Sequence, residues 1–169
     1  MKLASLEAVA KSLNEASVPF LIAGGVAVNA HGYGRLTQDL DLIIRLAPDV
    51  VVRAFSALAG LEYAPRVPVT AEGFGDPVQR RRWTEEKGMF VLTFHSDQHR
   101  ETPIDLFVNE PFDFDEEYRH ALREEIAPGI PVRILRLSTL LKLKQDAGRP
   151  QDLADIDELR RLHGEDLDA

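Results

Sequence analysis

The chain has 169 residues, of which 44% are hydrophobic and 28% are charged, and it contains no cysteine. This composition is typical of one globular domain with a full core, and it excludes a disulfide framework, a thiolate metal site and a cysteine nucleophile. The net charge of −8 argues against a broad nucleic-acid-binding surface, because such surfaces are usually basic. No segment approaches the roughly 18 apolar residues of a membrane span, and the N-terminus lacks the apolar core of a signal peptide, so we expect a cytoplasmic protein.

Hydrophobic spacing predicts helices and strands that are interspersed along the chain. The first half is expected to contain a helix at 4–16, a strand at 18–24, a short helix that ends at the turn 32–34, a strand at 39–45, a helix at 48–58 and a weak strand at 61–65. The second half is expected to contain a helix at 76–87, strands at 89–95 and 103–109, a helix at 115–125, a strand at 131–135 and helices at 138–148 and 151–163. Asp76 and Ser138 are the predicted N-terminal caps of two of these helices.

This order of elements predicts an α/β (α+β) fold with a mixed β-sheet, flanking helices and a C-terminal helical segment. An all-parallel dinucleotide-binding sheet is not expected, because no G-x-G-x-x-G motif follows the first strand. No linker or internal repeat divides the chain. We therefore expect a single domain over 1–169, with a core at 18–110 and a C-terminal strand and helices at 113–164.

Two carboxylates lie inside the predicted strand QDLDLII at 38–44. In an extended chain Asp39 and Asp41 point to one face, while Leu40 and Leu42 point to the other. Like charges on one face repel each other, and their burial is costly unless something positive compensates for it. A divalent metal ion would do so. Asp105, in the predicted strand PIDLFVN, is the candidate third carboxylate of such a site.

A glycine pair, Gly24-Gly25, lies between the first two predicted strands and opens a helix of small residues. Glycine lets the backbone approach a phosphate closely, and the N–H groups of a helix that begins there face the anion. Arg35 and Thr37, on the loop before Asp39, are candidate nucleotide contacts. Alone, the glycine pair is consistent with a tight turn. Together with the two strand carboxylates it predicts a phosphate cradle beside a metal site.

The glycine pair, the Asp39-Leu40-Asp41 motif and Asp105 resemble the polymerase-beta-type nucleotidyltransferase superfamily. The stretches GGVAVNAHGYGRLTQDLDLII, WTEEKGMFVLTF, PIDLFV and LLKLKQDAGRPQDLADIDEL occur in the order seen in a small bacterial subgroup related to abortive-infection nucleotidyltransferase toxins. The resemblance spans residues 18–162. It implies a nucleotidyltransferase core that transfers a nucleoside monophosphate from an NTP to a hydroxyl or phosphate acceptor.

The resemblance also implies a cofactor and roles for the residues. Two Mg²⁺ (or Mn²⁺) ions would bind to Asp39, Asp41 and Asp105, and Asp105 would also act as a general base. The backbone of the glycine pair would hold the β- and γ-phosphates. Lys142 and Lys144 diverge on their predicted helix, and the resemblance selects Lys144 as the side chain that faces the phosphates.

Several acceptors are compatible with this chemistry. A toxin-type enzyme would modify tRNA, would have a cognate antitoxin as partner, and would need the basic run Arg80–Arg82 at the mouth of its site. An aminoglycoside-type antibiotic nucleotidyltransferase would need an acidic pocket, which a net charge of −8 could supply. Antitoxin-type minimal nucleotidyltransferases modify a tyrosine of a partner protein, but their Gly-Ser and Arg-Ser-Asp-x-Asp elements differ from those found here. We rank tRNA, or another toxin target, first.

A different class of function is a non-catalytic nucleotide-binding module on the same fold. The three acids and both glycines are intact, which argues against a decayed transferase. The basic run has an equally simple structural interpretation as a solvated helix face. Arg149 and Asp152 are expected to cap the last helix rather than to take part in chemistry.

Overall fold

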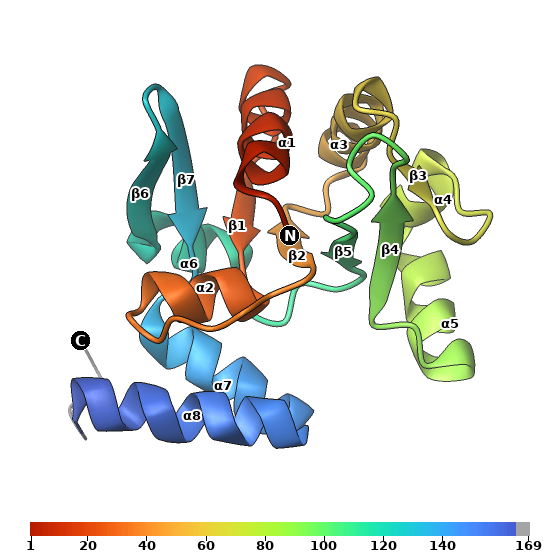
Figure 1. The fold of residues 1–169 in the computed structure, drawn as a ribbon. Coiled ribbons are helices and arrows are strands. Elements are labelled where there is room, and N and C mark those ends of the chain that lie inside the picture. Colours follow the sequence, from red (N-terminus) through yellow and green to blue (C-terminus); the bar gives the residue numbers. More distant parts are fainter. Residues whose placement is uncertain (165–169) are drawn as a thin grey trace.

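The computed structural model describes residues 1–164, so residues 165–169 of the expected domain lie outside the described residues. Seven strands form one sheet in the order β3-β4-β5-β2-β1-β7-β6 (Figure 1). The strands are β1 (Phe20–Ile22), β2 (Leu40–Ile44), β3 (Ala64–Pro65), β4 (Val91–His95), β5 (Ile104–Phe107), β6 (Leu122–Ala127) and β7 (Ile130–Ile134). The helices are α1 (Leu3–Glu15), α2 (Gly24–Ala30), α3 (Pro48–Gly60), α4 (Ala71–Gly75), α5 (Pro77–Lys87), α6 (Phe114–His120), α7 (Leu137–Ala147) and α8 (Pro150–His163).

The sheet is mixed, and the fold class predicted from the sequence is confirmed. β1 pairs antiparallel with β2 and parallel with β7, and β2 pairs parallel with β5. β4 is antiparallel to β5, as the two neighbouring strands at 89–109 suggested. Because β2 and β5 are parallel neighbours, their first residues meet at the same end of the sheet.

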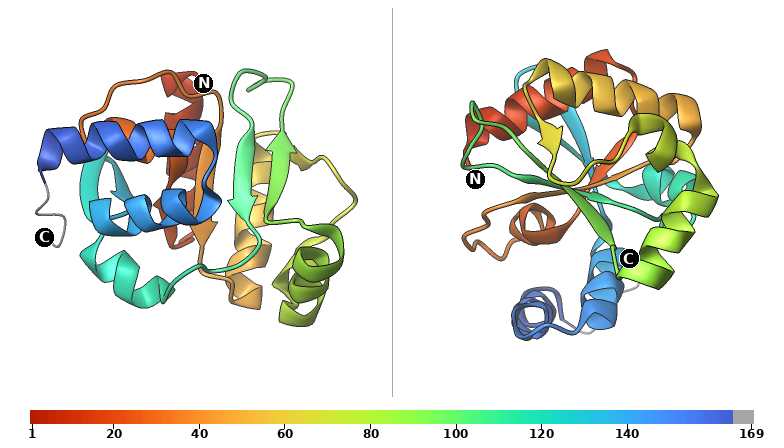
Figure 2. Two further views of the ribbon diagram at one scale, coloured as in Figure 1. Left: turned by 90° about the horizontal axis from the view of Figure 1, so that it is seen from below. Right: turned by 90° about the vertical axis from the view of Figure 1, so that its right-hand side faces the viewer.

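Helices lie on both faces of the sheet. Helices α1 and α3 pack against each other on one face, and α2, α7 and α8 lie on the other (Figures 1 and 2). The central strands are therefore covered on both sides, which explains why β1 is apolar at every position and buried throughout. The buried apolar side chains of the described residues form one continuous core. Within residues 1–164 no helix has the length and apolar character needed to cross a membrane.

The predicted helix at 115–125 is wrong in its second half. Helix α6 ends at His120, and Leu122–Ala127 forms the edge strand β6 against β7. The segment LREEIA contains residues that favour helix in isolation, so local propensity pointed to the wrong structure. Hydrogen bonds to β7 override that propensity, and the exposed charges of Arg123, Glu124 and Glu125 protect the sheet edge from pairing with another chain.

The two predicted helix caps had opposite outcomes. Asp76 caps α5 as predicted, because its Oδ1 accepts a hydrogen bond of 2.8 Å from Val78 N and Pro77 occupies the first turn. Ser138 does not cap α7, which begins one residue earlier, at Leu137. The N–H of the preceding Arg136 instead donates to Glu117 Oε1 at 2.8 Å. A carboxylate from α6 thus accepts a hydrogen bond at the start of α7. No pattern in the sequence around Ser138 indicates this distant partner.

Candidate functional site

Gly24 brings the backbone against the carboxylate of Asp41. Its φ is +58°, and a Cβ at this position would lie 1.7 Å from Asp41 Oδ2. The N–H of Ala23 also donates to the carbonyl of Asp41 at 3.0 Å. Only glycine is compatible with this turn. Any other residue would be strained in the left-handed backbone conformation, and its Cβ would overlap with Asp41. The glycine pair and the second strand carboxylate are therefore parts of one local structure.

Asp41 and Asp105 are direct neighbours in the sheet. They are register partners on the parallel strands β2 and β5, so their side chains emerge on the same face. Asp39 precedes β2 by one residue and shares the strand face of Asp41. All three carboxylates are half-buried. The structure thus brings the three predicted aspartates to one end of the sheet.

Thr93 holds the carboxylate of Asp105 from the neighbouring strand β4. The two residues are register partners, and Thr93 Oγ1 donates to Asp105 Oδ1 at 2.5 Å. The sequence interpretation missed this residue. A signal for it existed, because Thr93 is the polar residue between the buried apolar Leu92 and Phe94 of the predicted strand. The hydrogen bond fixes the orientation of the Asp105 carboxylate from the side of β5 opposite β2.

The pKa of Asp41 reflects this crowded arrangement. Burial raises the pKa of the Asp41 carboxyl from 3.8 to about 7, and the negative charges of Asp39 and Asp105 act in the same direction. The positive charges of Lys144 and Arg149 act against them but do not balance the sum. The start of β2 therefore carries more negative charge than the neighbouring cations neutralise. This excess of negative charge favours the binding of a cation.

The carboxylates at the start of β2 and β5 offer oxygen ligands for a metal ion but not a complete ligand set. Among residues 1–164, no group of three or more His, Cys, Asp or Glu side chains is arranged so that it could hold a metal ion by itself. Mg²⁺ is usually bound by one or two carboxylates together with water and substrate phosphates. The carboxylates of Asp41 and its neighbours fit that pattern. The donor set is therefore suited to an ion that binds together with a triphosphate.

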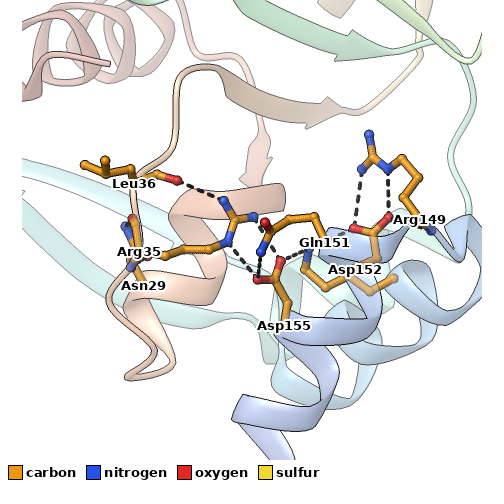
Figure 3. A network of polar contacts seen from close by, with 8 residues as sticks. Asn29, Arg35, Leu36, Arg149, Gln151, Asp152 and Asp155 are labelled. Carbon is orange, nitrogen blue, oxygen red and sulfur yellow. Dashed lines mark hydrogen bonds and ion pairs between the residues drawn. The ribbon is translucent and has the colours of Figure 1, made fainter.

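The loop between α2 and β2 carries the two other predicted nucleotide contacts. Thr37 Oγ1 donates to the carbonyl of Asp39 at 3.2 Å, and a Cβ on Gly25 would lie 2.5 Å from the same hydroxyl. Arg35 lies between the glycine turn and helix α8. Its Nη1 is 3.3 Å from the position of a Cβ on Gly25, and its Nε and Nη2 lie 2.7 and 2.9 Å from the two oxygens of Asp155 (Figure 3). The loop is thus packed against the glycine turn at one point and anchored to the C-terminal helix at another.

Lys144 is a buried ion-pair partner and not a solvated side chain. Its Nζ lies 2.7 Å from Asp155 Oδ2 and 3.1 Å from Asp152 Oδ1, and only 6% of its side chain is exposed. Both aspartates are also buried. Asp152 in turn accepts a hydrogen bond of 2.7 Å from Arg149 Nε, as expected for a residue that clamps the start of α8. These side chains form a charged network, centred on Asp152 and Asp155, that joins α7, α8 and the loop after α2 (Figure 3).

The basic run at the start of α5 is not one continuous surface. Arg80 is buried, and its Nη1 donates to the carbonyl of Phe74 at 2.6 Å, which ties α5 to α4. Arg82 is exposed and is paired with Glu86 on the same helix. Only Arg81 and Arg82 present their side chains to solvent. One of the three arginines that suggested an RNA-facing patch is therefore engaged in packing instead.

Replacing Gly24 with Ala tests how tightly the turn depends on glycine. We expect a loss of stability of at least about 1–2 kcal/mol from the left-handed backbone alone, with more from the displacement of Asp41. Urea unfolding measures this change. Gly34→Ala is the matched control, because Gly34 has a φ outside the left-handed region and a Cβ added to it would meet no atom within 4 Å beyond its chain neighbours. Equal stability of the two variants would contradict the close packing of Gly24 on Asp41.

Comparison with known proteins adds information on the fold. The chain matches no family model and no curated protein. The solution structure of the antibiotic-resistance factor ANT(2'')-Ia has a TM-score of 0.61 at 13% identity, over 96% of this chain and 84% of that one. A crystal structure of ANT(2'')-Ia in complex with adenylyl-2''-tobramycin has a TM-score of 0.57 at 12% identity, over 96% and 89%. An antigenic nucleotidyltransferase-like protein from Paracoccidioides brasiliensis has a TM-score of 0.53 at 17% identity, over 95% and 75%.

The chain has a nucleotidyltransferase fold. These similar structures extend over nearly the whole chain, including the C-terminal helices α7 and α8. At identities of 12–17% the likeness concerns the fold and not the substrate. In this nucleotidyltransferase fold the glycine turn, the carboxylates of β2 and β5 and the charged network of α8 meet at one end of the sheet.

Proposed function

We propose that the protein is a metal-dependent nucleotidyltransferase that transfers a nucleoside monophosphate from an NTP to an acceptor hydroxyl. The observation that carries this proposal is the position of Asp41. It is the register partner of Asp105 on the neighbouring strand, and its carboxylate packs against Gly24. Two adjacent, incompletely neutralised carboxylates suit a ligand that consists of a cation and a polyphosphate. The nucleotidyltransferase fold supports the same reaction class.

Each residue of the site has a role in this proposal. Asp39, Asp41 and Asp105 would hold Mg²⁺ together with the triphosphate. When bound, Mg²⁺ would supply neutralisation of the phosphate charge and a lower pKa for the acceptor hydroxyl. The backbone at Gly24 and Gly25 would contact the phosphates, and the absence of side chains there lets Asp41 and Thr37 pack directly against the same turn.

Asp105 is the proposed base for the acceptor proton. Its carboxylate is oriented by Thr93, and its strand lies on the side of β2 away from the glycine turn. An acceptor hydroxyl bound over β5 would therefore approach the nucleotide from the side opposite the phosphates. This arrangement suits an in-line displacement at the α-phosphorus.

For the acceptor we favour a cationic small molecule over tRNA. Arg80 is buried and Arg82 is paired with Glu86, so the basic run that favoured tRNA offers little free positive charge. The net charge of −8 and the three carboxylates of the site attract a polyamine-like substrate and repel a polyanion. A toxin-type reaction on tRNA, with a cognate antitoxin as partner, is the alternative.

The experiment that tests the proposal is nucleotidyl transfer with defined acceptors. The protein is incubated with each α-³²P-labelled NTP and Mg²⁺, in the presence of either a panel of aminoglycosides or total tRNA. Labelling of an aminoglycoside supports the favoured acceptor. Labelling of tRNA that weakens when Arg81 is replaced by Ala supports the toxin-type reaction instead. A protein that binds Mg²⁺·NTP but labels nothing fits the non-catalytic module, and one that binds no nucleotide contradicts the proposal.

Mg²⁺ and the nucleotide are expected to bind cooperatively. The carboxylates repel one another in the free protein, and the described residues supply no complete metal cage. Mg²⁺ alone should therefore raise the melting temperature very little, whereas Mg²⁺ with an NTP should raise it by more than the sum of the two separate shifts. Differential scanning fluorimetry with each ligand alone and with both measures this effect. Strictly additive shifts would contradict a shared site.

A further inference from the structure

Arg149 differs from the other cations of the charged network in its exposure. The side chains of Arg35 and Lys144 are 20% and 6% exposed, whereas that of Arg149 is 77% exposed. Arg35 and Lys144 are both fully engaged with buried carboxylates. Withdrawing either cation from its partner would leave a buried negative charge without compensation, which is costly. Of the three, only Arg149 can take a new anionic partner at low cost.

The position of Arg149 is nevertheless well defined. Its Nε donates to Asp152 Oδ2 at 2.7 Å, its Nη2 lies 3.4 Å from Asp152 Oδ1, and its backbone N–H donates to the same carboxylate at 3.3 Å (Figure 3). Asp152 is itself held by Lys144 from α7. The guanidinium is thus anchored along one edge, and Nη1 has no hydrogen-bond partner within residues 1–164. A free edge on an anchored guanidinium suits binding of phosphate oxygens.

The free edge of Arg149 lies in the electrostatic field of the carboxylate site. The hydrogen bond to Asp152 raises the pKa of the Arg149 guanidinium, and the charges of Asp41 and Asp39 act in the same direction. No direct hydrogen bond joins Arg149 to either aspartate among the described residues. Contacts through Asp152, Lys144, Asp155 and Arg35 join Arg149 to the loop that packs on the glycine turn, so its free, solvent-exposed edge belongs to the same end of the sheet as the carboxylates.

We propose that Arg149 binds the β- and γ-phosphates of the nucleotide and stabilises the pyrophosphate that leaves. This proposal rests on the proposed function and adds a residue to it. In the transfer, the acceptor oxygen bonds to the α-phosphorus while the bond from that phosphorus to the bridging oxygen breaks. The electron pair of that bond stays on the pyrophosphate, and the acceptor proton passes to Asp105. A fixed guanidinium beside the leaving group offsets the charge that develops there.

This role replaces the ones that the sequence suggested for the same region. Arg35 was a candidate nucleotide contact, Lys144 was expected to face the phosphates, and Arg149 was expected only to cap α8. The structure shows Arg35 and Lys144 engaged in the support of Asp152 and Asp155. The same support fixes Arg149, since Asp152 contacts both Lys144 and Arg149. Arg35 and Lys144 are therefore positioning residues, and Arg149 makes the contact.

Isothermal titration calorimetry tests the proposal. The probes are the α,β-methylene analogues of the four NTPs, which cannot be cleaved at the reacting bond, and the corresponding nucleoside monophosphates, each with Mg²⁺. For Arg149→Gln we expect the affinity for the triphosphate analogue to fall on the order of 10- to 100-fold, as for loss of a charge-assisted hydrogen bond. The affinity for the monophosphate should change little. Arg149→Lys should recover only part of the loss, because lysine cannot form the paired contact.

The matched control is Arg160→Gln, which removes the same charge from an exposed position near the other end of α8. Its affinity for the triphosphate analogue should equal that of the unmodified protein. If Arg149→Gln binds the triphosphate analogue as tightly as this control, the proposal for Arg149 is overturned and the proposed function stands. If Arg149→Gln weakens the monophosphate equally, Arg149 supports the site as a whole and the phosphate assignment is wrong. If the unmodified protein binds no nucleotide, the proposed function itself fails.

Discussion

Replacing Asp41 with Asn is expected to abolish nucleotidyl transfer and, at the same time, to raise the stability of the ligand-free protein. Asn keeps the shape of the side chain over Gly24 but removes a charge that Asp39 and Asp105 repel. If Asp41 holds Mg²⁺ as proposed, its loss removes several kcal/mol of transition-state stabilisation, which corresponds to a decrease in rate of about 10³-fold or more. Transfer assays and urea unfolding of the same variant measure the two effects.

The gain in stability should depend on pH in a defined direction. The pKa of Asp41 is raised from 3.8 to about 7 by burial and by its acidic neighbours, so the folded state holds the proton more tightly than the unfolded state does. The unmodified protein therefore loses stability as the pH rises from about 4 to about 7, and the loss is complete above pH 7. The advantage of Asn should be absent near pH 4 and reach on the order of 2–4 kcal/mol at pH 8.

Asp97→Asn serves as the control for this experiment, because Asp97 is exposed on the loop after β4. Its stability should follow that of the unmodified protein at every pH. A destabilised Asp41→Asn protein that still binds Mg²⁺·NTP would contradict the metal-site interpretation. Such a result would indicate that Asp41 is a structural hydrogen-bond acceptor.

Replacing Lys144 with Met is expected to cause the largest loss of stability among single changes at the site. Lys144 is buried between Asp152 and Asp155, and its removal leaves two buried carboxylates with less compensation. Breaking a buried ion pair from one side typically costs on the order of 3–5 kcal/mol. Lys142→Met is the matched control on the same helix. Lys142 is exposed, so its replacement should change the free energy of unfolding by less than about 0.5 kcal/mol.

The pH dependence of stability and a double variant test whether the loss in Lys144→Met comes from the unpaired carboxylates. Burial raises the pKa of Asp155, but hydrogen bonds from Arg35 and Lys144 outweigh it and keep the pKa below its usual value. The stability from these pairs is present above about pH 4 and is lost as the pH falls through the lowered pKa values. The penalty of Lys144→Met should accordingly be constant between about pH 5 and pH 7 and shrink only as the pH falls below about 4. Adding Asp155→Asn should recover part of the loss at pH 7.

Lys144→Met also decides between the two roles considered for this lysine. A phosphate-facing lysine would leave the ligand-free protein stable and would weaken only nucleotide binding. A buried positioning residue would lower stability first and nucleotide binding as a consequence. A Lys144→Met protein as stable as Lys142→Met would contradict the buried network and return Lys144 to the phosphate site.

The sequence by itself determined that the fold has a mixed sheet with flanking helices, and it predicted most of the elements but not the order of the strands. Residue alternation in QDLDLII placed Asp39 and Asp41 on one strand face, and the apolar runs around Asp105 marked a second buried strand. The glycine pair indicated a turn that needs a backbone without side chains, and Gly24 does adopt a left-handed conformation. These features depend on local periodicity and local sterics, which a single sequence contains in full.

Only the tertiary structure decided which charged groups pair with one another. Arg35 and Asp155 are 120 residues apart in the chain, and nothing near either residue indicates the other. The burial of Lys144 and Arg80, the hydrogen bond that Glu117 accepts at the start of α7 and the strand β6 all depend on long-range contacts of the same kind. Their physical reason is shared, because burial removes water from a polar group and forces it to find a partner wherever the fold places one. For that reason the position of the carboxylates could be predicted from the sequence, whereas the partners of the charged side chains around them could not.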